Sequence, residues 1–227
     1  MARFHADTYF RRAWEAGVNL PVSGFAAPVK LAAEQNLWEP AFLTSAMLVE
    51  AFHLRLVFGL FRKLRHNPTH VWAVLLNANI DVNAFSQVVK ELLKEPYDRW
   101  LANTCGRNDA ARAFATWRDG TRPMRNKVVH AVQRYSAEAL CKATLTNVAY
   151  MRLSNEAVRN NKGFEPAGDL RRGLPRGGHL SSGQSELEFR RVGLVRPFQG
   201  FPPSPRQIAA RRLKPKLEAV IRSAGML

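Results

Sequence analysis

The feature of the chain that most constrains its fold is an apolar stretch between Pro40 and Leu64. Apolar residues recur there at spacings of three and four, which places them on one face of a helix. Proline is tolerated at the first helical position because its missing N–H would be unpaired anyway. A helix of about 26 residues spans roughly 39 Å, a length suited to a bundle. The predicted buried face consists of Leu43, Met47, Ala51, Leu54, Phe58 and Phe61, widened by Val57, Leu60 and Leu64.

Three more helical segments follow this stretch. The second begins after Asp81 and is split by Pro96, because proline removes a helical hydrogen bond. The third begins at Asp109 and is interrupted at 119–121 before it continues. Ser136 supplies the N-cap of the fourth. Four long helical segments with short connections predict an all-α protein, built as an antiparallel four-helix bundle.

Composition divides the chain into three parts. Residues 1–35 are predicted to be an N-terminal extension, and residues 36–160 form the bundle. The extension begins with a short amphipathic helix whose apolar side is Phe4, Tyr9, Phe10 and Trp14. A loop over 20–28 follows, with a further helical turn allowed over 29–35. Residues 161–227 hold 9 of the 14 glycines and 7 of the 13 prolines. Such a segment buries too little apolar surface to offset the entropy lost on ordering. We therefore expect a disordered tail over 162–205, followed by a basic helix over 206–223.

The charge of the chain indicates the kind of partner it binds. The formal net charge is +16, and the tail carries +8 of it, from 13 Lys and Arg against 5 Asp and Glu. A charge of this size favours anionic partners, of which nucleic acid comes first and an anionic membrane surface second. A membrane partner is not expected, because His53 and Arg55 break the most apolar run and leave no span of ~18 residues.

Cysteine usage bears on cellular location and cofactors. Cys105 and Cys141 are the only cysteines, and they lack the Cys-x-x-Cys spacing of a zinc site. Two such cysteines do not make a disulfide framework either. The first residues lack the apolar run of a signal peptide, so a reduced, cytoplasmic setting is expected. No glycine-rich phosphate loop is present, and neither a metal nor another cofactor is predicted.

The candidate chemistry lies in the segment 122–130, which reads RPMRNKVVH. It supplies a guanidinium at Arg125, a carboxamide at Asn126 and an imidazole at His130. Cleaving RNA without a metal requires a base for the 2′-OH, an acid for the leaving oxygen and a cation for the developing charge. Histidine titrates near neutral pH, and arginine can hold two phosphate oxygens at once.

Spacing decides which of these three side chains share a helix face. Asn126 and His130 are four residues apart and lie on the same face. Arg125 and His130 are five apart and lie about 140° from each other around an ideal helix. Arg125 must therefore reach the site with its long side chain or from the end of the helix.

The pattern Arg-Asn-x-x-x-His resembles the R-x4-6-H signature of HEPN domains (higher eukaryotes and prokaryotes nucleotide-binding domains). These are all-α bundles, and many are metal-independent ribonucleases. The resemblance covers roughly residues 36–160. It implies that His130 is the acid or base, that Arg125 clamps the phosphate and that Asn126 orients the ring or the phosphate. The expected function is that of a bacterial toxin or defence ribonuclease that cleaves single-stranded RNA, with an antitoxin as a candidate partner.

A single motif carries only one histidine, whereas acid and base together require two. The resemblance implies that the second comes from a homodimer with two motifs facing a shared cleft. Within the chain, His53 is the alternative. Glu50 and His53 lie three residues apart on the first long helix, either on a solvated edge or facing the cleft beside His130.

A second function, without chemistry, fits the same composition. A helical module could hold nucleic acid or a partner protein through its basic surface and tail. The arginine pairs at 171–172, 190–191 and 211–212 would then neutralise phosphates without sequence preference, or belong to a solvated extension. Deleting 162–227 should nearly abolish binding by such a module and leave cleavage by an enzyme largely intact.

Overall fold

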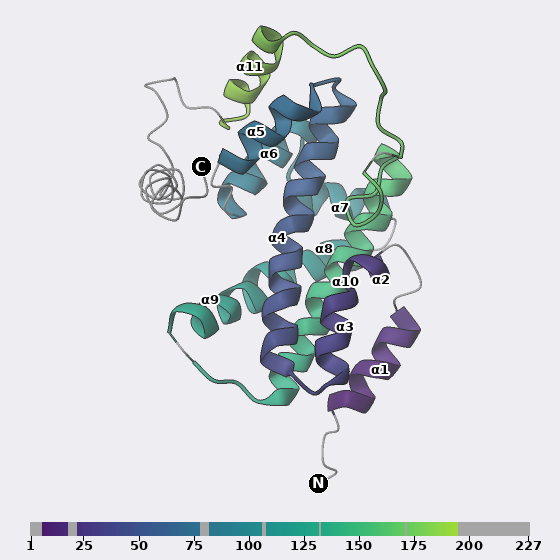
Figure 1. The fold of residues 1–227 in the computed structure, drawn as a ribbon, viewed down its shortest axis with the longest axis vertical. Coiled ribbons are helices and arrows are strands. Elements are labelled where there is room, and N and C mark those ends of the chain that lie inside the picture. Colours follow the sequence, from purple (N-terminus) through teal and green to yellow (C-terminus); the bar gives the residue numbers. More distant parts are fainter. Residues whose placement is uncertain are drawn as a thin grey trace, which may run out of the picture.

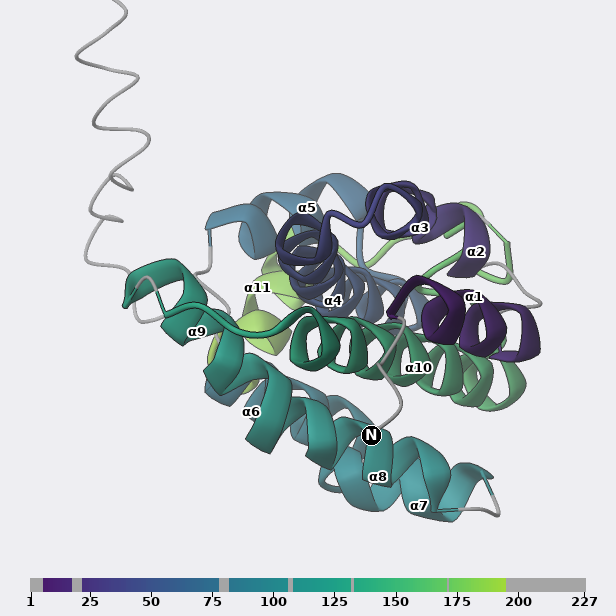
Figure 2. The same cartoon turned by 90° about the horizontal axis from the view of Figure 1, so that it is seen from below.

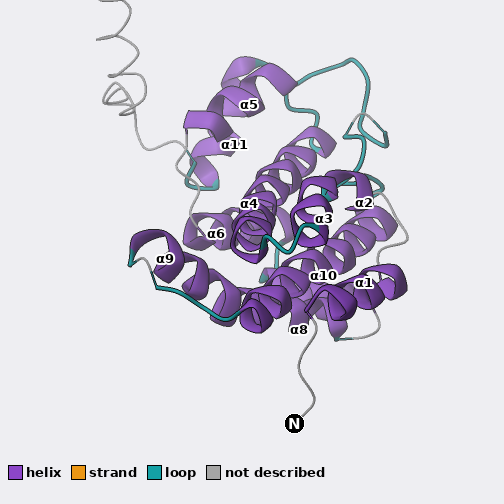
Figure 3. Ribbon diagram, turned by 60° about the horizontal axis from the view of Figure 1, so that its bottom comes forward, coloured by secondary structure: helices purple, strands orange, loops and turns teal. Residues whose placement is uncertain are grey.

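The computed structural model describes residues 6–17, 22–77, 82–105, 108–131, 133–170 and 172–194. These residues form helices and connecting loops and include no strand, which confirms the all-α class (Figure 1 and Figure 3). The elements in chain order are α1 (Ala6–Gly17), α2 (Val22–Phe25), α3 (Ala27–Glu34), α4 (Trp38–Lys63), α5 (Pro68–Asn77), α6 (Val82–Leu93), α7 (Tyr97–Cys105), α8 (Asp109–Thr116), the π-helical turn η1 (Trp117–Thr121), α9 (Arg122–His130), α10 (Ala137–Lys162) and α11 (Ser182–Arg191).

Two 26-residue helices, α4 and α10, form the centre of the molecule. They run parallel, because Ser45 meets Asn147 and, further along both helices, His53 meets Tyr150. Figure 1 shows both helices rising from the end at which α9 lies. The antiparallel arrangement expected from short connections therefore does not hold for this pair. The chain between them consists of the short helices α5 to α9 (Figure 1). Together these helices bring the chain back to the end of the molecule at which α4 began, in place of the two long helices that were predicted.

The first long helix lies where it was predicted, but its buried side differs. Phe42, Val49 and Phe52 are fully buried, whereas Met47, a member of the predicted face, is 63% exposed. The helix is apolar around most of its circumference, so three- and four-residue spacings can be drawn through more than one stripe. The packing of α3 on one side and α10 on another selects the stripe that is buried.

The expectation that His53 and Arg55 leave no span of ~18 residues is wrong, because α4 is long and apolar enough to cross a bilayer by length and composition. In this structure 56% of its most apolar 18-residue window is buried inside the protein. Buried polar residues on the same helix, including His53 and Arg62, hydrogen-bond to other parts of the chain. These contacts are those of a core helix.

Local sequence signals set several helix boundaries. The hydroxyl oxygen of Ser136 accepts a hydrogen bond from the backbone N–H of Ala139 at 3.2 Å, as expected of an N-cap. The chain breaks between α6 and α7 at Pro96, as predicted. The predicted interruption at 119–121 is instead a π-helical turn that leads α8 directly into α9. Pro123 cannot donate a hydrogen bond to the preceding turn, and a wider turn accommodates this missing donor.

The N-terminal segment packs on the same core as the long helices. Phe10 and Trp14 of α1 are buried as predicted, whereas Tyr9, predicted on the same side, is 45% exposed. The Phe10 ring lies 5.7 Å from the ring of Trp38. The segment 20–28, expected to be a loop, contains α2 and the start of α3, and the helical turn allowed over 29–35 is the rest of α3. Phe4, predicted to belong to the apolar side of α1, lies outside the described residues.

The segment 163–194, which we call the strap, folds against α4 and α5, so the prediction of disorder is wrong for its described residues (Figure 1). Phe164 inserts at Gly59, where a Cβ atom would lie 2.0 Å from the ring. Phe189 of α11 packs on Phe61, with ring centroids 5.0 Å apart. Composition could not reveal this docking, because sockets on a distant helix stabilise it rather than local periodicity. The helix predicted at 206–223 lies outside the described residues.

Candidate functional site

The helix α9 carries the Arg-Asn-x-x-x-His motif at one side of the molecule (Figure 2). Pro123 lies in its first turn, a position where its fixed backbone angle suits a helix start. Val128 is the buried residue of α9 and attaches it to the core. The remaining side chains of the helix are partly or fully exposed, so the motif lies on the surface rather than beneath hydrophobic residues.

A buried chain of polar side chains supports the start of α9. The hydroxyl of Thr121 lies 3.0 Å from Oδ1 of Asn147 and 3.2 Å from the carbonyl oxygen of Trp117, which share its single proton. The amide of Asn147 donates to Oγ of Ser45 at 2.7 Å, and that hydroxyl donates to the carbonyl oxygen of Phe42, also at 2.7 Å. This polar relay links η1, α10 and α4. Because its members are satisfied inside the core, it fixes where α9 begins.

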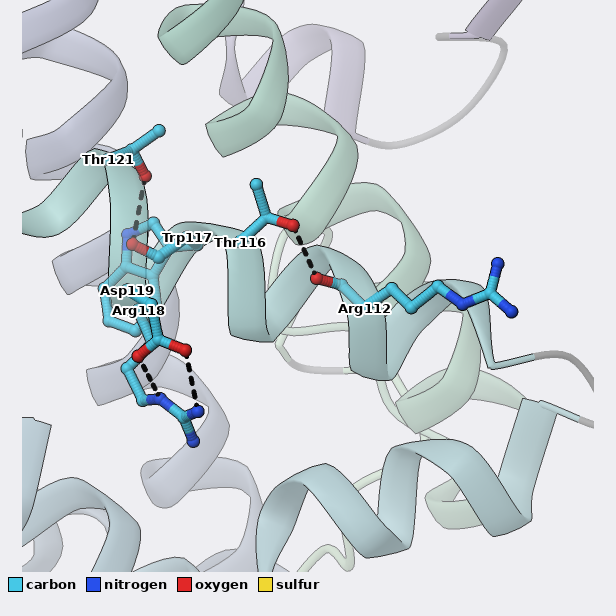
Figure 4. Close-up of polar contacts among 6 residues, drawn as sticks. All are labelled: Arg112, Thr116, Trp117, Arg118, Asp119 and Thr121. Carbon is cyan, nitrogen blue, oxygen red and sulfur yellow. Dashed lines mark hydrogen bonds and ion pairs between the residues drawn. The ribbon is translucent and has the colours of Figure 1, made fainter.

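The exposed side of η1 carries a neutralised charge pair. The guanidinium of Arg118 donates from Nε and Nη2 to the two carboxylate oxygens of Asp119, at 2.8 and 2.9 Å (Figure 4). The hydrogen bonds from Arg118 lower the pKa of Asp119, and the same bonds raise the pKa of Arg118. Just before this turn, the hydroxyl of Thr116 bonds the carbonyl oxygen of Arg112 at 2.9 Å (Figure 4). These contacts lie within α8 and η1 and involve none of the motif residues of α9.

The structure brings three of the proposed site residues together. Nη1 of Arg125 donates to Oδ1 of Asn126 at 3.2 Å, and Nη2 of Arg125 lies 3.3 Å from a carboxylate oxygen of Glu50 on α4. The side chain of Glu50 is 57% exposed and that of Arg125 is 27% exposed. An ion pair this close to water contributes little to stability and can exchange for another anion. Arg125 is thus a guanidinium whose present partner a phosphate could replace.

His130 ends α9 and is exposed. Among the described residues its ring has no hydrogen bond and no ring contact. Helix geometry places it on the face of Asn126, four residues earlier, and about 140° from Arg125. Arg125 faces α4 through Glu50, so His130 and Arg125 of one chain do not meet. One chain therefore presents the imidazole and the guanidinium as separate groups.

His53, the in-chain candidate for a second imidazole, lies in the core and not at this surface. It is 5% exposed, its ring stacks on Phe85 at 4.0 Å, and its Nε2 lies 2.7 Å from the hydroxyl oxygen of Tyr150. Burial, and then the charge of Arg122, lower its pKa to about 3. It is neutral at ordinary pH and cannot reach a substrate at the surface. The sequence placed it beside Glu50, but its position on the helix points it toward α10 instead.

Sequence reasoning missed the residues of the polar relay. Asn147 and Thr121 are fully or nearly buried, and neither belongs to the motif. A signal was present, because Asn147 is four residues from Ala143 and from Met151 and so lies on the same helix face as these apolar residues. A buried carboxamide requires partners, and this requirement would have pointed to neighbouring polar residues.

No group of three or more His, Cys, Asp and Glu side chains that could hold a metal ion is found in the described ranges. A comparison of the chain with known proteins finds no matching family model, no matching curated protein and no matching solved structure.

Proposed function

We propose that the protein is a metal-independent endoribonuclease of the HEPN type, a toxin or defence protein that acts on single-stranded RNA. The observation that supports it most is the Arg125–Asn126 pair on the same short helix as the exposed His130, whose ring has no hydrogen bond to any described residue. In this proposal Arg125 holds the phosphate, Asn126 orients the ring or the phosphate, and His130 moves a proton. The proposal rests on the motif and not on bundle topology, because α4 and α10 run parallel.

The guanidinium of Arg125 and the imidazole of His130 are separate within one chain, so a homodimer is part of the proposal. Because Arg125 faces α4 and His130 faces another direction, a single chain lacks a complete site. Two copies with their α9 helices facing each other would supply two imidazoles, one as base and one as acid. We therefore expect a homodimer under conditions in which the protein cleaves RNA.

The test uses end-labelled single-stranded RNA in the presence of EDTA. The wild type is expected to cleave it and to leave 2′,3′-cyclic phosphate ends. His130→Ala should lower the rate by about 10²–10⁴-fold, the usual contribution of a positioned acid or base. His70→Ala, which removes an imidazole from α5, is the matched control and should cleave like the wild type. Equal rates for His130→Ala and the wild type would show that this imidazole is not part of the chemistry.

Arg125 requires a control for the loss of charge. Arg125→Ala should lower cleavage by about 10²–10³-fold if the guanidinium stabilises charge in the transition state. Arg112→Ala removes the same charge from α8 and should leave cleavage nearly unchanged. Equal losses in the two variants would indicate nonspecific attraction of RNA.

Truncation distinguishes the enzyme from a binding module without chemistry. The cut should follow residue 194, because the strap packs on α4 and its removal would expose the core. Residues 195–227 contain seven Lys and Arg and one Glu, a net charge of +6. An enzyme without them should keep most of its cleavage. Tight RNA binding by the wild type without cleavage, lost on truncation, would instead establish the binding module.

A further inference from the structure

A groove lies at the opposite end of α4 from α9, between α4, the start of α5 and the strap. Its volume is about 680 Å³, within the range of small-molecule sites. Side chains that matter for a ligand are Phe58 and Arg62 from α4, Trp72 from α5, and Leu174, Arg176 and His179 from the strap. No Asp or Glu is among the described residues that line it.

Arg62, in the wall of this groove, is a buried charge without a counter-ion among the described residues. The residue is 7% exposed, and its guanidinium donates only to neutral acceptors: the carbonyl oxygens of His66 and Pro175 and Nδ1 of His179. Burial lowers its pKa, and no nearby carboxylate raises it. A buried charge that lacks an opposite charge is costly, and an anion in the groove would offset that cost.

The hydrogen-bonding capacity of Arg62 is also incomplete. A guanidinium has five N–H groups, and the contacts above use two on Nη1 and one on Nη2. The Nε–H and the second Nη2–H have no acceptor among the described residues. Nε and Nη2 are neighbouring nitrogens of the guanidinium, so these remaining N–H groups are available to the oxygens of a phosphate or carboxylate.

The other walls are aromatic and basic. The rings of Phe58 and Trp72 stack with centroids 4.3 Å apart and planes 20° apart, which gives the groove a flat apolar wall. Arg176 is exposed at its rim and adds positive potential. The positive end of the α5 dipole, at Pro68, lies in the same lining. A ligand that fits has a phosphate for Arg62 and a planar ring for the aromatic wall.

We propose that this groove binds a phosphorylated ligand with a planar ring, of the class to which mononucleotides belong, with its phosphate on Arg62 and Arg176 and its ring against Trp72. The site is separate from α9 and does not depend on cleavage of RNA.

The test titrates the full-length protein with AMP, adenosine and inorganic phosphate at one ionic strength, by calorimetry and tryptophan fluorescence. AMP should bind at least about tenfold more tightly than either fragment, since hydrogen bonds to charged groups contribute about 1.5–3 kcal/mol. AMP should slow hydrogen exchange of the strap over 172–180. Affinities of AMP and adenosine that are equal would overturn the phosphate site, and affinities of AMP and phosphate that are equal would overturn the ring site.

Variants at exposed positions avoid effects on folding. Arg176→Gln should weaken AMP binding by about tenfold. Arg172→Gln removes the same charge from an exposed strap residue outside the described lining, and should have little effect. Equal effects of the two variants would overturn the assignment. Arg176→Gln should leave RNA cleavage unchanged, so failure of this site and failure of the proposed ribonuclease give different results.

Discussion

Two parts of α4 treat their buried polar groups in opposite ways. In its first half and at its middle, Ser45 and His53 are satisfied by side chains of α10, and the polar relay extends to Thr121 below α9. Near its end, Arg62 has neutral partners only. Just past that end, both ring nitrogens of the buried His66 lack a hydrogen bond in the described part of the chain.

This difference indicates that one part of α4 supports a neighbouring surface and the other binds a ligand. A satisfied internal network has little capacity left for a ligand, but it holds the surface above it in one position. A network with unused donors keeps capacity for a ligand and is less stable without one. We therefore assign the first half of α4 to positioning α9, and its end to the strap and the groove. Variants at the two parts of α4 should therefore affect α9 and the strap separately.

The largest effect is expected where the strap meets α4. Gly59→Ala would place a Cβ atom 2.0 Å from the ring of Phe164, so the ring must leave its socket. The lost burial should weaken docking of the strap by about 3–5 kcal/mol, offset by up to about 1 kcal/mol of helix propensity. Hydrogen exchange should become faster over the strap and stay unchanged in α9.

Two further variants check the cause of that effect. Gly183→Ala in α11 meets nothing within 4 Å and should leave the strap docked. Phe164→Ala should cost much less in the Gly59→Ala background than in the wild type, because residues in contact are not additive. Full additivity of the two changes would show that the ring and Gly59 do not interact.

The second prediction concerns how the free energy of unfolding depends on pH through His53, near the middle of α4. Burial lowers the pKa of His53 from 6.5 to about 3 in the folded protein, whereas the unfolded chain takes up a proton near 6.5. The unfolded state thus binds more protons between these values, and stability falls as pH decreases through that window. The loss is about 1.4 kcal/mol per pH unit below 6.5. Above pH 6.5 both states are neutral at this position, and no dependence is expected.

His53→Gln keeps a hydrogen-bonding group near Tyr150 but cannot take up a proton. Urea unfolding at pH 7.5, 5.5 and 4.5 should show a flatter dependence for the variant than for the wild type. Burial also lowers the pKa of His66, so His66→Gln should flatten the profile in the same direction. Identical pH profiles for the wild type and His53→Gln would contradict the buried neutral imidazole.

The third prediction compares two threonines that each bond the carbonyl oxygen four residues earlier (Figure 4). Thr121→Val would leave Oδ1 of the buried Asn147 without its partner and cost about 1–3 kcal/mol. Thr116→Val affects an exposed hydroxyl and should stay within about 0.5 kcal/mol of the wild type. Hydrogen exchange in α9 should become faster only in Thr121→Val. Equal protection of α9 in both variants would show that the polar relay does not position it.

These contrasts also explain which parts of the fold could be predicted from the sequence. Local chemistry fixed the cap at Ser136 and the break at Pro96, and both were predicted correctly. The partners of His53 and Gly59 lie about 100 residues away, and no local pattern indicates them. The parallel course of α4 and α10 likewise depends on how the several short helices between them pack. Exposure of the motif was left open by the sequence, and the structure shows it because only Val128 of α9 is buried.

In the candidate site, too, some positions could be predicted from spacing along a helix and others could not. Arg125 and Asn126 are neighbours in the chain, but neighbours on a helix do not face each other, so spacing did not predict the hydrogen bond between them. Glu50 was expected to lie near the motif if its helix edge faced the cleft, and the structure places it on Arg125. His53 was paired with it by spacing, but its side of α4 is covered by α10. A helix face can be read from spacing, whereas the element that covers it cannot.

The smallest expected effect on stability is that of Glu50→Gln, which removes the carboxylate partner of Arg125. The pair is exposed, so the change should alter the free energy of unfolding by less than about 1 kcal/mol. RNA binding should nevertheless become tighter, because Glu50 competes with phosphate for the guanidinium and repels the RNA backbone. Glu39→Gln, at the exposed start of α4, changes the net charge equally and should have a smaller effect. RNA affinities measured at two salt concentrations separate these cases, since a local competitor affects one contact and net charge affects all of them. Equal gains in the two variants would show that Arg125 does not contact the phosphate backbone.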